Sequence, residues 1–525
     1  MPKITREMRD PDTPKSVNIT DQAPPPKTDP TLGITVPRPS GPRPPHRLVT
    51  IGDSLTHGFQ SGAIYNTRIS YPMIVAWELG WDSSMRIPVY DGFGGLPLNI
   101  EYLVRDVEHR FGAVNWLELP LAAFHIRNYM DQLEDWWERG PGSSVPNTVG
   151  IKHNLAVYGW DLRDVLARNA DTCRLAIKKP KDDLLAQLIE NANERAALRV
   201  LHTARGTGDK ALTPLEAAQE LGKDGIETLI VFVGANNALG TVVKLDVTWS
   251  TDPEYKDLEQ KNKFTIWDPE HFESELALME KEVRKINAQH VIWATVPHVT
   301  IAPLARGVGR DKVRPDSRYF PFYTRPWIGD AQFDPTDDPK ITSQEARAID
   351  SAIDQYNDAI AAVVKRGRQA GRDWYLLDVA GLLDRLACRR YYESVPARPE
   401  WWTPYELPPD LLSMKPVPDS YFFTSDANGR IRGGLFSLDG VHPTTICYGV
   451  LAQEMIRVME LAGVEFLMGD GKTVRKTPVN VNFKRLIGLD TLNSAPPQSL
   501  SSDLKWAGKI DQLGDTFTRL FRKGA

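Results

Sequence analysis

The sequence is poor in cysteine: Cys173, Cys388 and Cys447 are the three among its 525 residues. They lie far apart, and neither a C-x-x-C pair nor a Cys/His cluster with the spacing of zinc ligands occurs. We therefore expect three reduced core cysteines, no structural metal and no cofactor.

Long apolar runs and a strong excess of one charge are also lacking. No run approaches the length that spans a bilayer, and the opening segment MPKITREMRDPDTPK has no apolar stretch of the kind found in secretory signals. The formal charge of −5 comes without a lysine/arginine stripe that would attract a nucleic acid. These absences predict a soluble, cytoplasmic protein without a transmembrane segment or a nucleic-acid partner, and they leave its oligomeric state open.

Prolines and charges dominate residues 1–45, which close with VPRPSGPRPP. Such a stretch buries too little apolar surface to offset the entropy lost on ordering. We expect a disordered or extended arm over 1–45, with the folded domain beginning at 46.

Beyond the arm, short apolar runs alternate with helical patterns. Runs of this length and β-branched character are typical of strands that are covered on both faces. The runs are RLVTI from Arg47, NLAV from Asn154, LIVFVG from Leu229, HVIWATVP from His290 and WYLLDV from Trp374. Strands that alternate with helices predict the α/β class with a parallel sheet and right-handed crossovers.

Three stretches between and after these runs have helical periodicity. The clearest places Phe272, Leu276, Met279, Val283 and Ile286 on one face through spacings of four and three. A second helix is predicted from residue 342, and a third after residue 443.

The remaining long stretches fit a strand–helix alternation poorly. We expect one domain over 46–470 with insertions that form lids or binding loops, and a polar tail that carries one weak amphipathic helix. The insertions lie at about 85–150, 300–340 and 389–435; the tail covers 471–525, with its helix near Leu504–Phe521.

Ser54 directly follows the first predicted strand, within Gly52-Asp53-Ser54-Leu55. A nucleophile at the carboxyl end of a strand faces the crevice where open α/β sheets bind ligands. A serine at this place is equally typical of a helix N-cap. The G-x-S-x-G nucleophile elbow is missing, which argues against the ordinary α/β-hydrolase fold.

An activated serine needs a base, and the base needs a group that fixes its tautomer. Asp439 and His442 stand three residues apart with Gly440 between them, so the carboxylate can fold back onto the imidazole. The same pattern also suits a loop whose aspartate caps the turn before a helix.

Two further residues are candidate donors to an oxyanion. Asn236 follows the strand that begins at Leu229, and Gly159 follows the run that begins at Asn154. An asparagine amide or a glycine N–H at such a place can stabilise a developing alkoxide. Each residue alone is also ordinary turn chemistry. Together with the serine and the Asp/His pair, they make up the parts that acyl transfer requires.

These motifs resemble the GDSL, or SGNH, hydrolase family. GDSLTHG, NLAVYGWDLRD, VGANN and DGVHP are similar to its first, second, third and fifth blocks, and the likeness spans about 47–463 apart from the insertions. NLAVYG is closest to the phospholipase-B-like branch, and TVPHVTIAP is similar to a proline-bearing stretch of its lipases. The resemblance implies a three-layer α/β/α sandwich with a parallel, flavodoxin-like sheet.

The resemblance also implies a role for each site residue. Ser54 would be the nucleophile, His442 the base and Asp439 the residue that orients it. The Ser54 N–H, the Gly159 N–H and the Asn236 side chain would form the oxyanion hole. Asn237 stands where the family usually has an aspartate, which puts the supporting hydrogen bonds of that loop in question.

Four other residues compete for these roles. Gly94 and Gly95 are rivals for the oxyanion glycine, although neither follows a predicted strand. His57 is close to Ser54 in sequence but lies on the exit of the same turn, so we interpret it as a rim residue. His298 follows a strand and is a weaker rival for the base.

The pattern as a whole predicts a serine hydrolase that cleaves carboxylic esters, of lipase, esterase or phospholipase type, through an acyl-serine intermediate. Its partner would be a small-molecule ester or lipid. The aromatic segment 391–421 suggests an apolar acyl group, or alternatively a loop packed on the core. Two other hypotheses remain: a carbohydrate deacetylase or acyltransferase with the same site, and a catalytically inert binding protein of the same fold.

Overall fold

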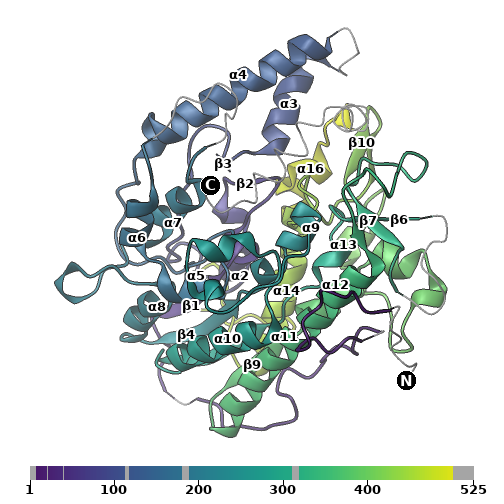
Figure 1. Ribbon diagram of the computed structural model, residues 1–525. Helices are drawn as coiled ribbons and strands as arrows, with labels where there is room; N and C mark the ends of the chain where they lie inside the picture. Colours follow the sequence, from purple (N-terminus) through teal and green to yellow (C-terminus); the bar gives the residue numbers. More distant parts are fainter. Residues whose placement is uncertain are drawn as a thin grey trace.

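A central sheet of four parallel strands forms the core of the computed structural model, which describes residues 8–20, 22–39, 41–112, 118–179, 189–309 and 318–500. The strands lie in the order β1-β4-β5-β9 (Figure 1). Their bounds are β1 (His46–Gly52), β4 (Ile226–Phe232), β5 (Ala288–Ala294) and β9 (Trp374–Leu377). Four of the five predicted strands are thereby confirmed.

The fifth predicted strand, NLAV, runs along the free edge of β1 without becoming a regular strand. The Leu155 N–H donates to the Thr50 carbonyl at 2.9 Å, and the Val157 N–H donates to the Gly52 carbonyl at 3.2 Å. Only one parallel bridge, between Thr50 and Asn154, satisfies the geometry of a ladder. The segment turns away soon afterwards at Gly159, whose φ of +75° ends the extended run.

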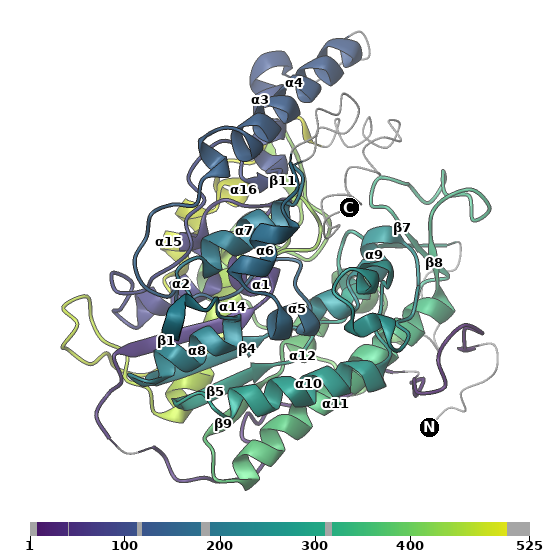
Figure 2. The ribbon, with the colours of Figure 1, turned by 60° about the vertical axis from the view of Figure 1, so that its left-hand side comes forward.

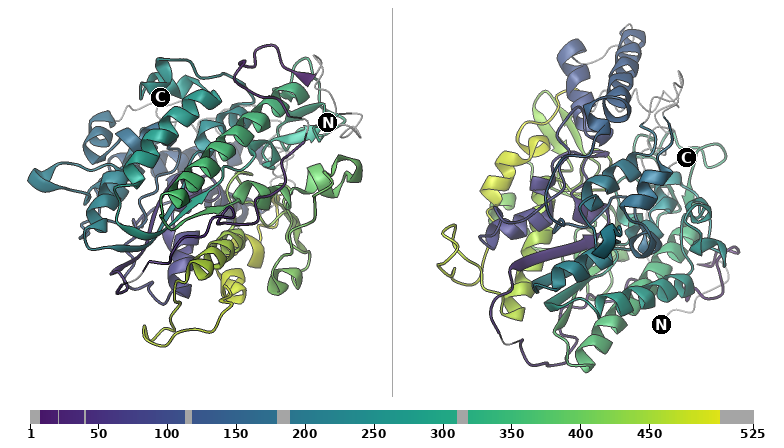
Figure 3. Two further views of the ribbon diagram at one scale, coloured as in Figure 1. Left: turned by 90° about the horizontal axis from the view of Figure 1, so that it is seen from below. Right: turned by 90° about the vertical axis from the view of Figure 1, so that its left-hand side faces the viewer.

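Helices cover both faces of the sheet (Figures 1 and 3). Side chains alternate along each strand, so Ile51, Val231 and Trp293 belong to one apolar cluster, whereas Ile230 and Ile292 belong to another. The first cluster is covered by α8 (Pro214–Gly222), α10 (Pro269–Val283) and α11 (Ser343–Gln369), and the second by α2 (Tyr71–Glu78) and α14 (Thr445–Ala462). The protein is thus an α/β protein with a parallel sheet between helices, as the sequence predicts.

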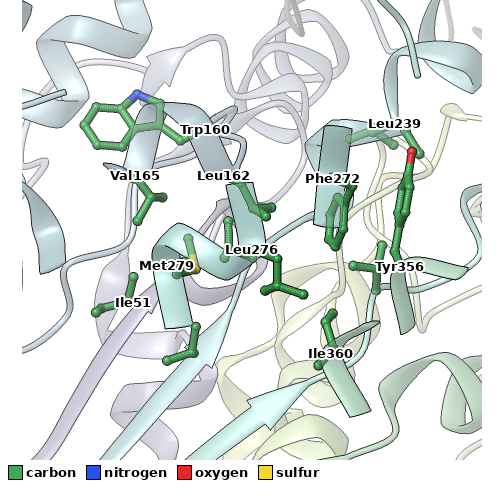
Figure 4. Packing of buried hydrophobic residues seen from close by; sticks show 14 of the residues in the cluster. Ile51, Trp160, Leu162, Val165, Leu239, Phe272, Leu276, Met279, Tyr356 and Ile360 are labelled. Carbon is green, nitrogen blue, oxygen red and sulfur yellow. The ribbon is translucent and has the colours of Figure 1, made fainter. Parts of the chain in front are cut away.

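The three predicted helices are α10, α11 and α14. In α10, Phe272, Leu276 and Met279 of the expected face are buried in the first cluster (Figure 4), and Phe272 stacks on Tyr356 of α11 with ring centroids 4.0 Å apart. Helix α11 begins at a capping box, in which Thr342 and Glu345 each accept a backbone N–H of the other.

The first insertion is more regular than its sequence suggests. It contains α3 (Ile100–Phe111) and α4 (Leu119–Glu138), which stand away from the sheet (Figures 1 and 2). Neither α4 nor any other helix within the described ranges combines the length and apolarity needed to cross a bilayer.

The other two insertions contain short antiparallel strands. Those of the second are β6 (Arg306–Val308), β7 (Phe322–Thr324) and β8 (Ile341–Thr342); those of the third are β10 (Thr424–Asp426) and β11 (Gly429–Arg432). A pocket between these two insertions is described below.

The N-terminal arm is extended but docked, so the expectation of disorder is wrong for its described part. Val17 is 1% exposed within the first apolar cluster. The Thr20 N–H donates to Ser351 Oγ at 3.0 Å, and the Leu376 N–H of β9 donates to the Pro30 carbonyl at 2.9 Å. An extended chain can satisfy its backbone against the edge of a sheet, which composition alone does not reveal.

The polar tail is also packed as far as residue 500. Helix α15 (Phe483–Leu489) buries Phe483 and Leu486 in the second cluster, beside α14. A Cβ at Gly449 of α14 would lie 2.3 Å from Leu486, so the two helices touch closely there. The amphipathic helix expected near 504–521 lies outside the described residues.

The docked arm makes a stability prediction. Replacing Val17 with alanine should lower the free energy of unfolding by about 1–3 kcal/mol, because the change removes buried apolar surface and leaves a cavity. The matched change at Val149, which is 88% exposed, should stay within about 0.5 kcal/mol. Urea unfolding of the full chain measures both. Equal small effects at the two positions would mean that the arm does not dock.

Candidate active site

Ser54 opens a one-turn helix, α1 (Ser54–His57), directly after β1. The N-cap of this helix is Asp53, whose Oδ1 accepts the Leu55 N–H at 3.1 Å. The capping interpretation of Ser54 is therefore wrong, and its hydroxyl is left for another partner. The turn is tight: a Cβ at Gly52 would lie 2.5 Å from the Phe232 carbonyl oxygen, so only glycine fits there.

The partner of the Ser54 hydroxyl is His442. Ser54 Oγ lies 2.8 Å from His442 Nε2, and His442 Nδ1 lies 2.9 Å from Asp439 Oδ2. All three residues are buried, with exposures of 5%, 2% and 0% in that order. Ser54 and His442 are 388 positions apart in the sequence. The structure brings them together with Asp439 in the arrangement of a base-assisted nucleophile.

Asp439 is held by hydrogen bonds on both oxygens. Oδ1 accepts the N–H groups of Val441 at 2.9 Å and His442 at 2.8 Å, and Oδ2 also accepts the Gly62 N–H at 2.9 Å. Burial alone would raise the pKa of Asp439, but the adjacent His442 imidazole and these hydrogen bonds hold the pKa below its ordinary value. An ionised Asp439 keeps the proton of His442 on Nδ1, so Nε2 can accept from Ser54.

The candidate oxyanion donors follow neighbouring segments of the sheet. Asn236 Nδ2 donates to the Trp160 carbonyl at 2.9 Å, which joins two loops and leaves the second N–H of the amide available. Within the described part of the chain, the N–H groups of Ser54 and Gly159 have no protein acceptor. Gly159 and Asn236 are only partly buried, so this group of donors lies toward solvent.

Asn237 is fully buried and supports its loop. Its Oδ1 accepts the Leu162 N–H at 3.4 Å, while its carbonyl accepts the Trp267 N–H at 2.8 Å. Its Nδ2 is buried without a partner among the described residues. The side-chain oxygen therefore still connects this loop to the segment after Gly159.

His57 is a buried structural residue, and our interpretation of it as a rim residue is wrong. The Tyr158 N–H donates to His57 Nδ1 at 3.1 Å, and His57 Nε2 lies 2.7 Å from the Tyr90 hydroxyl, which itself donates to the Ala196 carbonyl at 3.0 Å. Burial lowers the pKa of His57 to about 3, so the ring is neutral. It therefore fixes the backbone immediately before Gly159.

His298 cannot serve as the base. Its Nε2 lies 2.9 Å from Asp354 and its Nδ1 3.0 Å from Asp384. Burial would lower its pKa, but the two carboxylates hold the pKa well above its ordinary value. A protonated ring with both nitrogens engaged has no lone pair to offer a serine.

The rival glycines are also used for packing. A Cβ at Gly94 would lie 2.6 Å from Leu133 of α4, and one at Gly95 would lie 2.9 Å from Ala63 of β2 (Ala63–Ile64). Both glycines therefore hold the first insertion against the domain, and Gly159 remains the oxyanion candidate.

Two residues that support the Gly159 loop could not be predicted from sequence patterns. Asn193, at the start of α7 (Ala192–Leu201), donates to the Tyr158 carbonyl and accepts the Trp160 Nε1–H at 2.8 Å. Lys261, with no exposed surface on its side chain, lies 2.6 Å from Asp161 directly after the loop. Each partner is more than 30 positions away, and no local pattern pairs them.

The described residues contain no group of three or more histidine, cysteine, aspartate and glutamate side chains that could hold a metal ion. Cys173, Cys388 and Cys447 are free and buried, as expected. No family model matches the chain, and comparison with curated proteins and with solved structures gave no significant match.

The neutral state of His57 predicts how stability depends on pH. Because its pKa is about 3 in the folded state and about 6.5 in the unfolded state, the unfolded chain takes up the proton first as the pH falls. This residue alone should lower the free energy of unfolding by about 2 kcal/mol between pH 7 and pH 5.

The His57→Gln variant should lose that part of the pH dependence, whatever its stability at pH 7. His109→Gln, an exposed position on α3, is the matched control. Urea unfolding at pH 7 and pH 5 gives the difference for each protein. An unchanged pH dependence in His57→Gln would contradict a buried neutral imidazole.

Proposed function

We propose that the protein is a serine hydrolase that cleaves carboxylic esters through an acyl-serine intermediate. The observation that carries the proposal is the hydrogen-bonded chain from Ser54 through His442 to Asp439. It supplies a nucleophile, a base and a residue that orients the base, and the Asn236 amide with the N–H groups of Ser54 and Gly159 are the candidate oxyanion donors.

The reaction would proceed in two steps. His442 Nε2 takes the Ser54 proton as Oγ attacks the ester carbonyl, and the carbonyl oxygen becomes an alkoxide that accepts from Ser54 N–H, Gly159 N–H and Asn236 Nδ2. His442 then protonates the leaving alcohol, and the carbonyl reforms as an acyl-Ser54 ester. Water, deprotonated by His442, hydrolyses that ester and regenerates the serine.

We further infer that the fold is of the SGNH type. When the edge segment 154–157 is counted beside β1, the spatial order of the sheet becomes second-first-third-fourth-fifth along the chain. This is the order of flavodoxin-like folds. The nucleophile, glycine and asparagine then follow the first, second and third strands, as the resemblance of the motifs implies.

The contacts of the aromatic segment do not specify which acyl group the substrate would carry. Tyr391 and Trp402 of the aromatic segment are buried against each other with ring centroids 5.7 Å apart, and Tyr405 is 8% exposed. These side chains pack the insertion on the domain, so they do not support a lipid acyl group. The proposal is therefore a carboxylic ester without a stated chain length. No contact in the site favours deacetylation or transfer to another acceptor.

Removal of the nucleophile is the first test. Ser54→Ala should lower kcat on p-nitrophenyl acetate or butyrate by about six orders of magnitude, because the members of a triad act as a unit. Ser84→Ala, an exposed serine, is the control and should leave kcat unchanged. An Ser54→Ala enzyme that keeps most of the activity would refute the proposal.

Removal of the oxyanion donor is the second test. Asn236→Ala should lower kcat about 10²–10³-fold with a much smaller change in KM, because the contact forms with the developing alkoxide and not with the ground state. Asn428→Ala, on the exposed β10–β11 turn, is the matched control. Loss through KM alone would assign Asn236 to substrate binding and contradict the oxyanion hole.

A further inference from the structure

A pocket lies between the second and third insertions, outside the catalytic triad. Its wall comes from four separate stretches of chain, 300–307, 320–326, 387–390 and 420–432. The pocket is small and opens to solvent, so it suits a small molecule and not a macromolecule.

The charges that line this pocket have one sign. Arg306, Arg389, Arg390 and Arg432 contribute to the wall, and no aspartate or glutamate does. Two of these arginines form ion pairs with carboxylates: Arg390 lies 3.0 Å from Asp350, and Arg306 lies 2.5 Å from Asp330.

The other two arginines have side-chain N–H groups that donate to no acceptor in the described residues. Arg389 makes one side-chain hydrogen bond within the described part of the chain, from Nη2 to the Gly307 carbonyl at 2.8 Å, and its Nε is buried without an acceptor. Burial and the Arg306 charge lower the pKa of Arg389. Arg432 lies over the Tyr421 ring, 4.4 Å from the centroid, and donates to no acceptor in the described residues. Arg389 is partly buried and forms no ion pair within the described residues, so an anion in the pocket would offset the cost of its burial, whereas Arg432 is exposed to solvent.

Apolar rings complete the wall. Arg389 lies over the Phe320 ring at 5.3 Å, and Tyr323 and Phe422 line the same space. Rings beside unsatisfied guanidinium groups favour a ligand that has an oxyanion at one end and an apolar chain at the other.

The pocket adjoins the back of the catalytic loop. The Leu304 N–H donates to the Gly440 carbonyl at 3.0 Å, and a Cβ at Gly440 would lie 2.8 Å from the Phe422 ring. Gly440 lies between Asp439 and His442 in sequence. A ligand that contacts Phe422 would therefore be close to the triad, with Gly440 between them.

We propose that this pocket binds an anionic amphiphile, a carboxylate or phosphate attached to a short apolar chain, with Arg389 and Arg432 holding the oxyanion and Phe320 and Phe422 the chain. The proposal concerns binding and holds whether or not the triad hydrolyses esters.

Calorimetric titration of the full-length Ser54→Ala protein tests the proposal without turnover. The probes are decanoate, decyl phosphate and the uncharged decanol, all below their aggregation limits. We expect saturable binding of one or both anions with one site per chain, and at least tenfold weaker binding of decanol. The ratio of the two anions tells whether carboxylate or phosphate is the natural head group.

Variants locate the binding in this pocket. In the Ser54→Ala background, Arg389→Gln and Arg432→Gln should each weaken anion binding about tenfold, whereas Arg457→Gln, on the exposed surface of α14, should not change it. The Arg432 side chain is exposed, so that variant decides the matter if Arg389→Gln fails to fold. The proposal is overturned if neither anion binds saturably, if decanol binds as tightly, or if both pocket variants bind like the control.

Discussion

The buried carboxylate of Asp439 is the group on which the site depends. It accepts four hydrogen bonds, three from backbone N–H groups and one from His442. A buried charge is tolerated only when it is fully paired in this way. The bond from Gly62 is the one that reaches outside the catalytic loop, because it ties that loop to the turn after α1. Ser54 and His442 therefore lie on segments that a single carboxylate holds together.

The sheet determines where the remaining groups lie. Parallel strands bring their carboxyl ends to one edge of the sheet, and Ser54, Gly159 and Asn236 each follow a segment that ends at this edge. The loops that carry them are cross-linked by the Asn236 amide on the Trp160 carbonyl and by His57 on the Tyr158 N–H. Preorganised donors of this kind stabilise charge without rearranging during the reaction.

Much of this arrangement could be predicted from sequence, because its signals are local. The continuous apolar runs predict five strands, of which four are confirmed, and the spacing of four and three predicts α10. Asp439 and His442 are three residues apart, so their pairing is a property of one loop. The position of Ser54 is equally typical of a helix N-cap. Only the structure shows that the N-cap residue is the neighbouring Asp53.

The errors concern contacts between distant segments. Composition predicts that the arm before β1 is disordered, yet Val17 is buried and Pro30 accepts a hydrogen bond from β9. The place of His57 at the exit of a turn predicts a rim residue, yet it is buried by contacts with Tyr158 and Tyr90, which are 101 and 33 positions away. The ion pair of Lys261 with Asp161 could not be predicted either, because the two residues are far apart in sequence. Local periodicity contains no information about which loops meet, and these pairings become visible only in three dimensions.

The central claim is that Ser54 is an activated nucleophile, and covalent labelling tests it most directly. The protein should be treated with a fluorophosphonate, which reacts with serine only when a base and an oxyanion hole assist, and the adduct located by peptide mass spectrometry. The account predicts one adduct per chain, on Ser54, that is lost in His442→Ala. The absence of an adduct, or an adduct on another residue with Ser54 unmodified, would contradict it.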